Sequence, residues 1–154
     1  MLALRVLQLY GADMVTATRP LLRDPSPQVR REIAISLQDS KSDPVNSLVE
    51  LSKEYDGQDR WYLEALGIGA DKQWDTVLGA WLAEVGDKWN NPAGRDVIWR
   101  SRSARTAALL VKIINDKNLA AQERDHYFRS LDFLTGPEKD AALVELLTSA
   151  SPAR

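Results

Sequence analysis

The sequence of 154 residues contains no cysteine and only one histidine, His126. The lack of cysteine excludes disulfides, thiolate metal sites, covalent haem attachment and a cysteine nucleophile. A single histidine also excludes a histidine cluster for a metal ion and the HExxH motif. We therefore expect no catalytic residue, no metal ligand and no cofactor in this chain, which is predicted not to be an enzyme.

Long hydrophobic runs and an excess of one charge are also lacking. No apolar run approaches the roughly 20 residues that span a bilayer, so we expect no membrane insertion by this segment. Lys and Arg number 20 against 22 Asp and Glu, a net charge of −2 with both signs mixed. This balance removes the simplest electrostatic argument for nucleic acid or an acidic membrane, although it leaves room for a local basic patch.

The motifs that usually carry chemistry are weak here. His126 next to Asp125 could act as a general base, but no GxSxG elbow presents a serine, and a partly exposed or packing histidine is favoured. Gly67-Ile68-Gly69 lacks the third glycine of a phosphate loop, so we expect these small residues to allow close approach of helices. Asp56 and Asp59 flank a glycine turn and could bind a cation, but helix capping is favoured.

The sequence does contain signals for the starts and ends of helices, and these signals are clearest from Asp24 to Leu37. Asp24-Pro25 ends one helix because a residue before proline is driven out of the α region. Ser26-Pro27 begins the next, with serine as N-cap and proline at the first helical position. An apolar face then recurs at helical spacing, formed by Val29, Ile33, Ala34 and Leu37.

A second copy of this unit follows about thirty residues later, within the usual range for helical repeats. From Asp59 to Ala70, large apolar side chains stand at the positions of Ile33, Ala34 and Leu37; they are Tyr62, Leu63 and Leu66. The next helix carries a regular apolar stripe: Trp74, Val77, Leu78, Trp81, Leu82 and Val85. The two tryptophans on this stripe are expected in the core.

The remaining chain also reads as short helices, with no alternating pattern of a half-buried strand. Asp87 to Gly94 is predicted to be the longest loop, and a last helix from Glu138 to Leu147 should turn Ala141, Val144 and Leu147 inward. The first expected helix ends near residue 10, and the second covers residues 13–23 with a bend at Pro20. The other expected helices cover residues 44–53, 95–100, 103–114 and 119–134. Antiparallel helix pairs in series therefore predict an all-α solenoid.

The spacing of Asp24, Val29 and Arg30 resembles the consensus of HEAT repeats. That resemblance implies a HEAT-like, armadillo-like α-α superhelix, a right-handed solenoid of about five helical hairpins. It also implies that Val29 packs between paired helices and that Asp24 and Arg30 form a hydrogen-bonded ladder between repeats. The second copy departs from the consensus, because Gln58 stands at the valine position.

Three segments resemble the helical-repeat middle region of large exported bacterial proteins similar to membrane-bound dehydrogenases; they are Tyr55–Ala70, Ile98–Ser103 and Tyr127–Phe133. In those proteins a propeller precedes the repeats and a c-type cytochrome domain follows them. The chain opens inside an amphipathic helix without the polar cap that solenoid ends usually need, so we expect an excised segment with Met1 as a cloning start. The resemblance implies that this segment is the middle region of such a protein, with an exported or periplasmic location. Residues 1–148 are expected to form the repeat domain and 149–154 a tail or linker.

Taken together, these features predict a non-catalytic scaffold that contacts a protein partner or neighbouring domains. Arginine and tryptophan are favoured at interface hot spots. The possible interaction surface is therefore assigned to Arg60, Trp61, Trp99, Arg100, Arg102 and Arg105. Packing is nevertheless favoured over partner contact for Trp61 and Trp99. The alternative function is a nucleic-acid-binding HEAT-like protein, similar to a DNA glycosylase, which would use a basic cluster formed by Lys88, Arg95, Arg100, Arg102 and Arg105.

Overall fold

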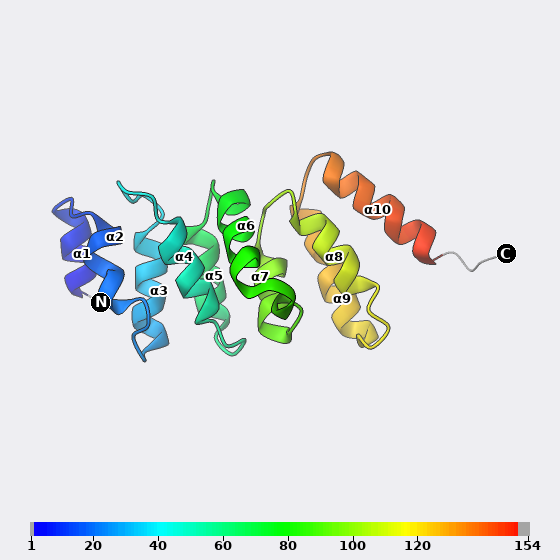
Figure 1. Ribbon diagram of the computed structural model, residues 1–154, viewed down its shortest axis with the longest axis horizontal. Helices are drawn as coiled ribbons and strands as arrows, with labels where there is room; N and C mark the ends of the chain where they lie inside the picture. Colours follow the sequence, from blue (N-terminus) through cyan, green and yellow to red (C-terminus); the bar gives the residue numbers. More distant parts are fainter. Residues whose placement is uncertain (1, 151–154) are drawn as a thin grey trace. The chain divides into compact units, whose positions relative to one another are not determined.

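The computed structural model describes residues 2–150 of the chain. These residues form ten α-helices and no strand, which confirms the predicted all-helical class (Figure 1). The helices are α1 (Leu2–Leu9), α2 (Met14–Thr18), α3 (Pro27–Ser36), α4 (Val45–Lys53), α5 (Arg60–Gly69), α6 (Trp74–Val85), α7 (Pro92–Arg100), α8 (Thr106–Ile114), α9 (Ala121–Ser130) and α10 (Pro137–Ala150). Within this part of the chain, no helix is both long and apolar enough to cross a membrane.

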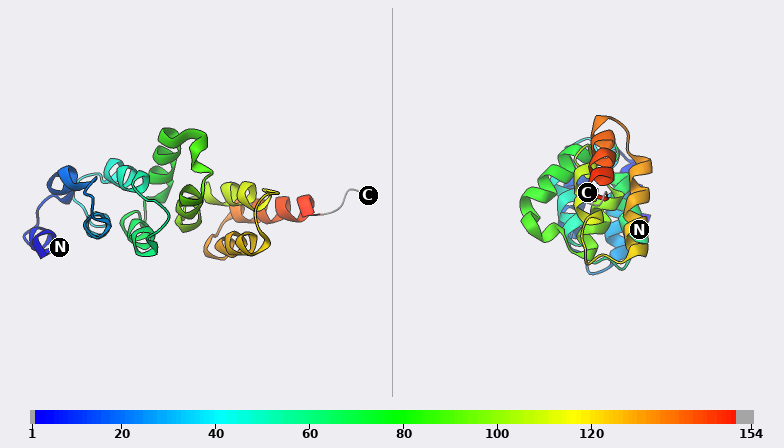
Figure 2. Two further views of the ribbon diagram at one scale, coloured as in Figure 1. Left: turned by 90° about the horizontal axis from the view of Figure 1, so that it is seen from below. Right: turned by 90° about the vertical axis from the view of Figure 1, so that its right-hand side faces the viewer.

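The chain divides into two compact units, one up to Val97 and the other from Ile98 onward. In the N-terminal unit, α3 packs against both α1 and α5, and α4 packs against α6. Each of these helices thus contacts its second neighbour along the chain. The result is two layers, with α1, α3 and α5 in one and α4 and α6 in the other (Figure 2).

Local chemistry explains where the helices begin and end. Pro20 ends α2, and the chain continues as a 3-10 turn over Arg19–Leu21, because proline cannot donate the next helical hydrogen bond. Pro27 opens α3 at its first turn. Asp59 caps α5, since its Oδ1 accepts hydrogen bonds from the Trp61 and Tyr62 amides at 2.9 and 3.2 Å. Gly57 adopts a positive φ of 82° in the turn before this cap.

The predicted apolar faces form the core of the N-terminal unit. Ile33, Ala34 and Leu37 of the first copy are completely buried. The matching positions of later helices are buried as well: Leu48, Val49, Tyr62, Leu63, Leu66, Trp74, Val77, Leu78 and Trp81. Val29, predicted to lie in the core, is only half-buried.

Helices α3 and α5 approach each other closely at Gly69. A Cβ atom at this position would lie 2.3 Å from the Ala34 carbonyl oxygen and 2.9 Å from a Leu48 methyl group. Such distances are impossible for a real side chain, so only glycine permits this packing. The expectation that the Gly67–Gly69 segment serves helix approach is therefore confirmed at Gly69.

Ion pairs join the helices at a nearly constant sequence separation. Their partners lie 27, 27, 28 and 31 residues apart in the chain, which matches the spacing of the two copies of the repeat. The pairs are Arg5–Glu32 at 3.2 Å, Arg23–Glu50 at 2.7 Å, Arg31–Asp59 at 3.3 Å and Lys53–Glu84 at 2.7 Å. This series, which we call the ion-pair ladder, places successive repeats in one register.

The C-terminal unit is built on α8, which packs against α9 and α10. Its buried centre contains Leu110, Ile113 and Leu131. The hydroxyl groups of Ser101 and Thr106 share a short hydrogen bond inside this unit, where both side chains are fully buried. Buried hydroxyls need such a partner because an unpaired polar group in the core is costly.

The predicted loop from Asp87 to Gly94 was wrong. A 3-10 turn covers Gly86–Trp89, and α7 begins at Pro92 rather than Arg95. The side chain of Asn91 supplies the helix start, because its Oδ1 accepts from the Gly94 amide at 2.9 Å. Its Nδ2 also donates to the Lys88 carbonyl at 2.7 Å, so one asparagine closes the turn and caps the helix.

The predicted inward face of the last helix was also wrong. Ala142 and Leu146 are buried, whereas Val144 and Leu147 are 60% and 72% exposed. The helix has apolar residues of its own on nearly every side, so periodicity alone does not select the face that packs against α8. Helix α10 continues to residue 150, and the expected tail beyond it, like Met1, lies outside the described residues.

Gly69→Ala should destabilise the N-terminal unit by about 2 kcal/mol, although alanine is the better helix former. The reason is the overlap between the new Cβ and the Ala34 carbonyl. Urea unfolding followed by circular dichroism measures this effect. Ala108→Leu adds more volume at an exposed position of α8 and should leave the midpoint of urea unfolding unchanged. Equal midpoints for the two variants would contradict the close approach of α3 and α5 at Gly69.

The ion-pair ladder should make stability depend on pH through Glu50. Hydrogen bonds from Lys53 and then Arg23 lower the pKa of the Glu50 carboxyl below its ordinary value. Its contribution is therefore present above the unfolded-state pKa and is lost as the pH falls through the folded-state pKa.

Thermal unfolding from neutral pH down to about pH 3 tests this dependence, since that range covers carboxyl titration. Glu50→Gln should flatten the acid loss of stability relative to the wild type. Glu145→Gln, at an exposed position of α10, is the control and should retain the wild-type profile. A wild-type profile in Glu50→Gln would show that this rung contributes nothing.

Candidate functional site

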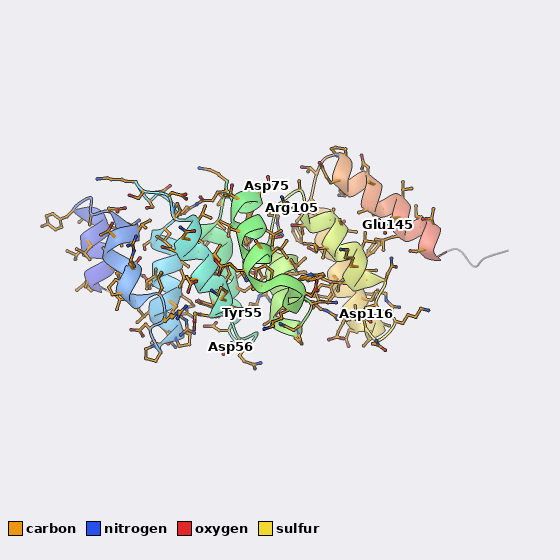
Figure 3. All side chains as sticks on the ribbon, in the orientation of Figure 1. Tyr55, Asp56, Asp75, Arg105, Asp116 and Glu145 are labelled. Carbon is orange, nitrogen blue, oxygen red and sulfur yellow. The ribbon has the colours of Figure 1, made fainter. Side chains whose placement is uncertain are left out.

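The side chains that could carry out chemistry in this chain either lie far from one another or have structural contacts. Residues 2–150 contain no group of three or more His, Cys, Asp or Glu side chains that could hold a metal ion. The ring of His126 stacks on Trp99, with centroids 4.9 Å apart and planes 17° apart, and meets Tyr127 edge-on. His126 is itself exposed, so the structure agrees with the predicted partly exposed or packing histidine. The capping prediction is confirmed for Asp59, whose Oδ1 accepts from the Trp61 amide. Asp56 (Figure 3) accepts instead from the Gln58 amide in the turn before the helix.

The residues of the predicted repeat ladder, Asp24, Val29 and Arg30, make contacts mainly within one hairpin. The Asp24 carboxylate accepts from the Ser26 amide at 2.8 Å, and Arg30 Nη1 donates to the Asp24 carbonyl. The contact of Arg30 with the next repeat is of another kind, because its guanidinium lies 5.3 Å from the Tyr62 ring centroid. Ionic contact between the repeats comes instead from the neighbouring Arg31, which pairs with Asp59.

Two buried tyrosines extend this contact toward α4 and α7. The rings of Tyr55 and Tyr62 stack with centroids 5.8 Å apart. Tyr62 donates its hydroxyl to the Leu51 carbonyl at 2.7 Å, and Tyr55 donates to Asp96 at 3.0 Å. Burial raises the pKa of Tyr62 to about 12 and, with the charge of Asp96, raises that of Tyr55 further. Both hydroxyls therefore remain protonated donors, which suits a structural role.

A cavity of about 470 Å³ lies beside α4, α6 and the start of α7 in the N-terminal unit. Several of its polar groups bond to one another or to adjacent residues. Lys53 at its wall binds Glu84 at 2.7 Å and Glu50 at 2.8 Å, and the Asn91 amide is engaged in capping α7. We place the candidate site on the opposite layer of the unit, where a largely exposed tryptophan lies beside two adjoining grooves.

The layer of α1, α3 and α5 carries two adjoining grooves. The groove between α3 and α5 measures about 360 Å³ and is lined by Arg31, Glu32, Ile35, Trp61, Glu64, Ala65 and Ile68. The groove between α1 and α3 measures about 280 Å³ and is lined by Leu4, Arg5, Gln8, Glu32, Ile35 and Ser36. Glu32 and Ile35 belong to both, so the grooves form one continuous surface, which we call the α1–α3–α5 face.

Trp61 projects from this face with 71% of its surface exposed. The Asp59 cap fixes the start of α5, and Tyr62, Leu63 and Leu66 then point into the core. One residue earlier, the side chain of Trp61 leaves the helix about 100° away from that of Tyr62, beyond the buried stripe. Arg60 is similarly exposed and lies 4.0 Å from Glu64.

The four predicted surface residues Trp99, Arg100, Arg102 and Arg105 divide between structural and exposed roles in the C-terminal unit. Arg102 donates to the carbonyls of Trp99, Arg100 and Ser101 after the end of α7, and its guanidinium lies 4.9 Å from the Phe133 ring centroid. Arg105 is exposed and Arg100 half-exposed. Arg102 thus acts as a C-terminal cap, a role that the sequence interpretation missed.

Trp61→Ala should leave stability nearly unchanged, because the indole is largely in water. The adjacent Tyr62→Ala should cost about 3–5 kcal/mol, since it empties a core position and removes the hydrogen bond to Leu51. Chemical denaturation of both variants measures the contrast. A loss of more than about 1 kcal/mol in Trp61→Ala would mean that the tryptophan serves packing instead.

Comparison with protein-family models, curated proteins and solved structures gave no match for this chain. The α1–α3–α5 face is consequently interpreted from its own geometry. Its defining features are a largely exposed tryptophan, two adjoining grooves and arginines along the rim.

Proposed function

We propose that this chain is a non-catalytic helical-repeat scaffold that binds a protein partner or a neighbouring domain through the α1–α3–α5 face. The observation that carries the proposal is the pair of continuous grooves beside Trp61, which is 71% exposed. An aromatic side chain kept in water gains nothing for folding. It gains free energy when a partner covers it, and tryptophan and arginine dominate interface hot spots.

The packing pattern supports a scaffold of the HEAT type. Contacts between second-neighbour helices and ion pairs 27–31 residues apart are the arrangement expected of stacked helical hairpins. We accordingly propose that the two layers belong to a right-handed HEAT-like superhelix. Such an array acts through its shape, because stacked hairpins hold a long surface and fix the spacing of whatever binds to it.

The wider context that we propose is a larger exported protein. The resemblance of three segments to dehydrogenase- and cytochrome-type multidomain proteins makes neighbouring domains the first candidates for the partner. A nucleic-acid function is less favoured, because Arg102, one of its expected contacts, is bonded to three backbone carbonyls.

Site-specific cross-linking tests the proposed face, and the absence of cysteine makes it straightforward. A photo-cross-linker attached to Ile68→Cys should capture protein from a lysate of the source organism, because Ile68 lines the groove between α3 and α5. The same reagent on Thr76→Cys, an exposed position of α6, is the matched control and should give no adduct.

Competition makes the result specific to the face. Unlabelled wild-type protein should abolish the adduct, whereas Trp61→Ala protein should compete at least tenfold less well. Equal adducts from both cysteine positions, or equal competition by the two proteins, would contradict the proposal.

A further inference from the structure

The two layers of the N-terminal unit carry opposite net charges. Helices α1, α3 and α5 together contain four arginines and two glutamates, a net charge of +2. Three of these arginines, Arg5, Arg31 and Arg60, lie at the outer face, because Arg30 is buried against Tyr62. Helices α4 and α6 contain one lysine and three acidic residues, including Asp75 near the start of α6, a net charge of −2 (Figure 3). The positive layer stands out because the whole chain carries −2.

Two of the three ion pairs on the α1–α3–α5 face direct their cations outward; in the third, Arg31 and Asp59 are about equally exposed. In the pair Arg5–Glu32, the arginine side chain is 71% exposed and the glutamate 18%. In the pair Arg60–Glu64, the corresponding values are 79% and 32%. An approaching partner therefore meets guanidinium groups first, while the carboxylates lie deeper. Each guanidinium has five N–H donors, so pairing with one carboxylate leaves donors for another.

Between these arginines the floor of the face is apolar. Ile35 and Ile68 are 41% and 38% exposed and line the groove between α3 and α5 beside Trp61. A groove between two helices, with an apolar floor, accepts side chains spaced at i, i+3, i+4 and i+7 on an amphipathic helix. Phosphate groups of a nucleic acid would satisfy the arginines but would leave this floor and Trp61 without an apolar partner.

We propose that the partner of the α1–α3–α5 face is an acidic amphipathic helix, with apolar side chains in the grooves and carboxylates toward Arg5 and Arg60. This inference rests on the proposed function, which it makes specific. Arginine suits the role because its planar fork can hold a carboxylate through two hydrogen bonds. The attraction should also speed association and weaken as salt is added.

A display library of helix-forming peptides tests the proposal. The surface positions of the peptide helix are randomised, and the peptides are selected for binding to the full 154-residue chain. Enriched peptides should combine a helical apolar stripe with an excess of Asp and Glu. Their binding should weaken at least tenfold in Trp61→Ala and at least fivefold in both Arg5→Gln and Arg60→Glu, with circular dichroism confirming that each variant is folded. Lys112→Glu, on an exposed position of α8, is the control and should bind as the wild type does.

The possible failures are distinguishable. Enriched peptides that depend on Trp61 but carry no acidic excess would overturn the acidic partner and leave the binding face intact. If no enriched peptide depends on Trp61, the proposed function fails together with this inference. A DNA duplex that binds at low salt and is lost in Arg60→Glu, without any enriched peptide, would replace the proposal with nucleic-acid binding.

Discussion

The close stacking of α3 on α5 is the contact on which the rest of the N-terminal unit depends. Gly69 brings its backbone against the Ala34 carbonyl, and no other residue type fits there. This approach sets the distance between successive repeats, and the ion-pair ladder keeps their register. Exposed ion pairs contribute little stability individually. The stability of the stacking therefore comes from the glycine contact and the apolar core, and the ion-pair ladder determines the register of the helices.

The same stacking produces the candidate surface. Because α1, α3 and α5 lie side by side, residues about thirty positions apart come together as a floor of Ile35, Ile68 and Trp61. Arg5 of the ladder then stands at the rim, with its partner Glu32 deeper. An ion pair that joins two helices thus also leaves a guanidinium group exposed on the outer face, which links the architecture to the proposed binding.

The sequence predicted most of the N-terminal helices because caps, prolines and apolar periodicity agree there. It failed where those signals compete: Asn91 caps a helix inside an apparent loop, and α10 is apolar on nearly every side. The exposure of Trp61 was not predicted, because packing was favoured for this residue. The grooves could not be predicted either, since they require Ile35 and Ile68 from separate helices to meet. The capping role of Arg102 was hidden for the same reason, because it depends on three-dimensional proximity to carbonyls.

Solvent paramagnetic relaxation measures the opposite charge of the helices in the two layers directly on the isolated protein. Backbone amide relaxation would be compared between a negatively and a positively charged nitroxide of the same size, at low salt. The negative probe should relax amides of α3 and α5 more strongly, and the positive probe should relax amides of α6 more strongly. Equal relaxation by the two probes, or the reverse preference, would contradict the opposite charge of the two layers.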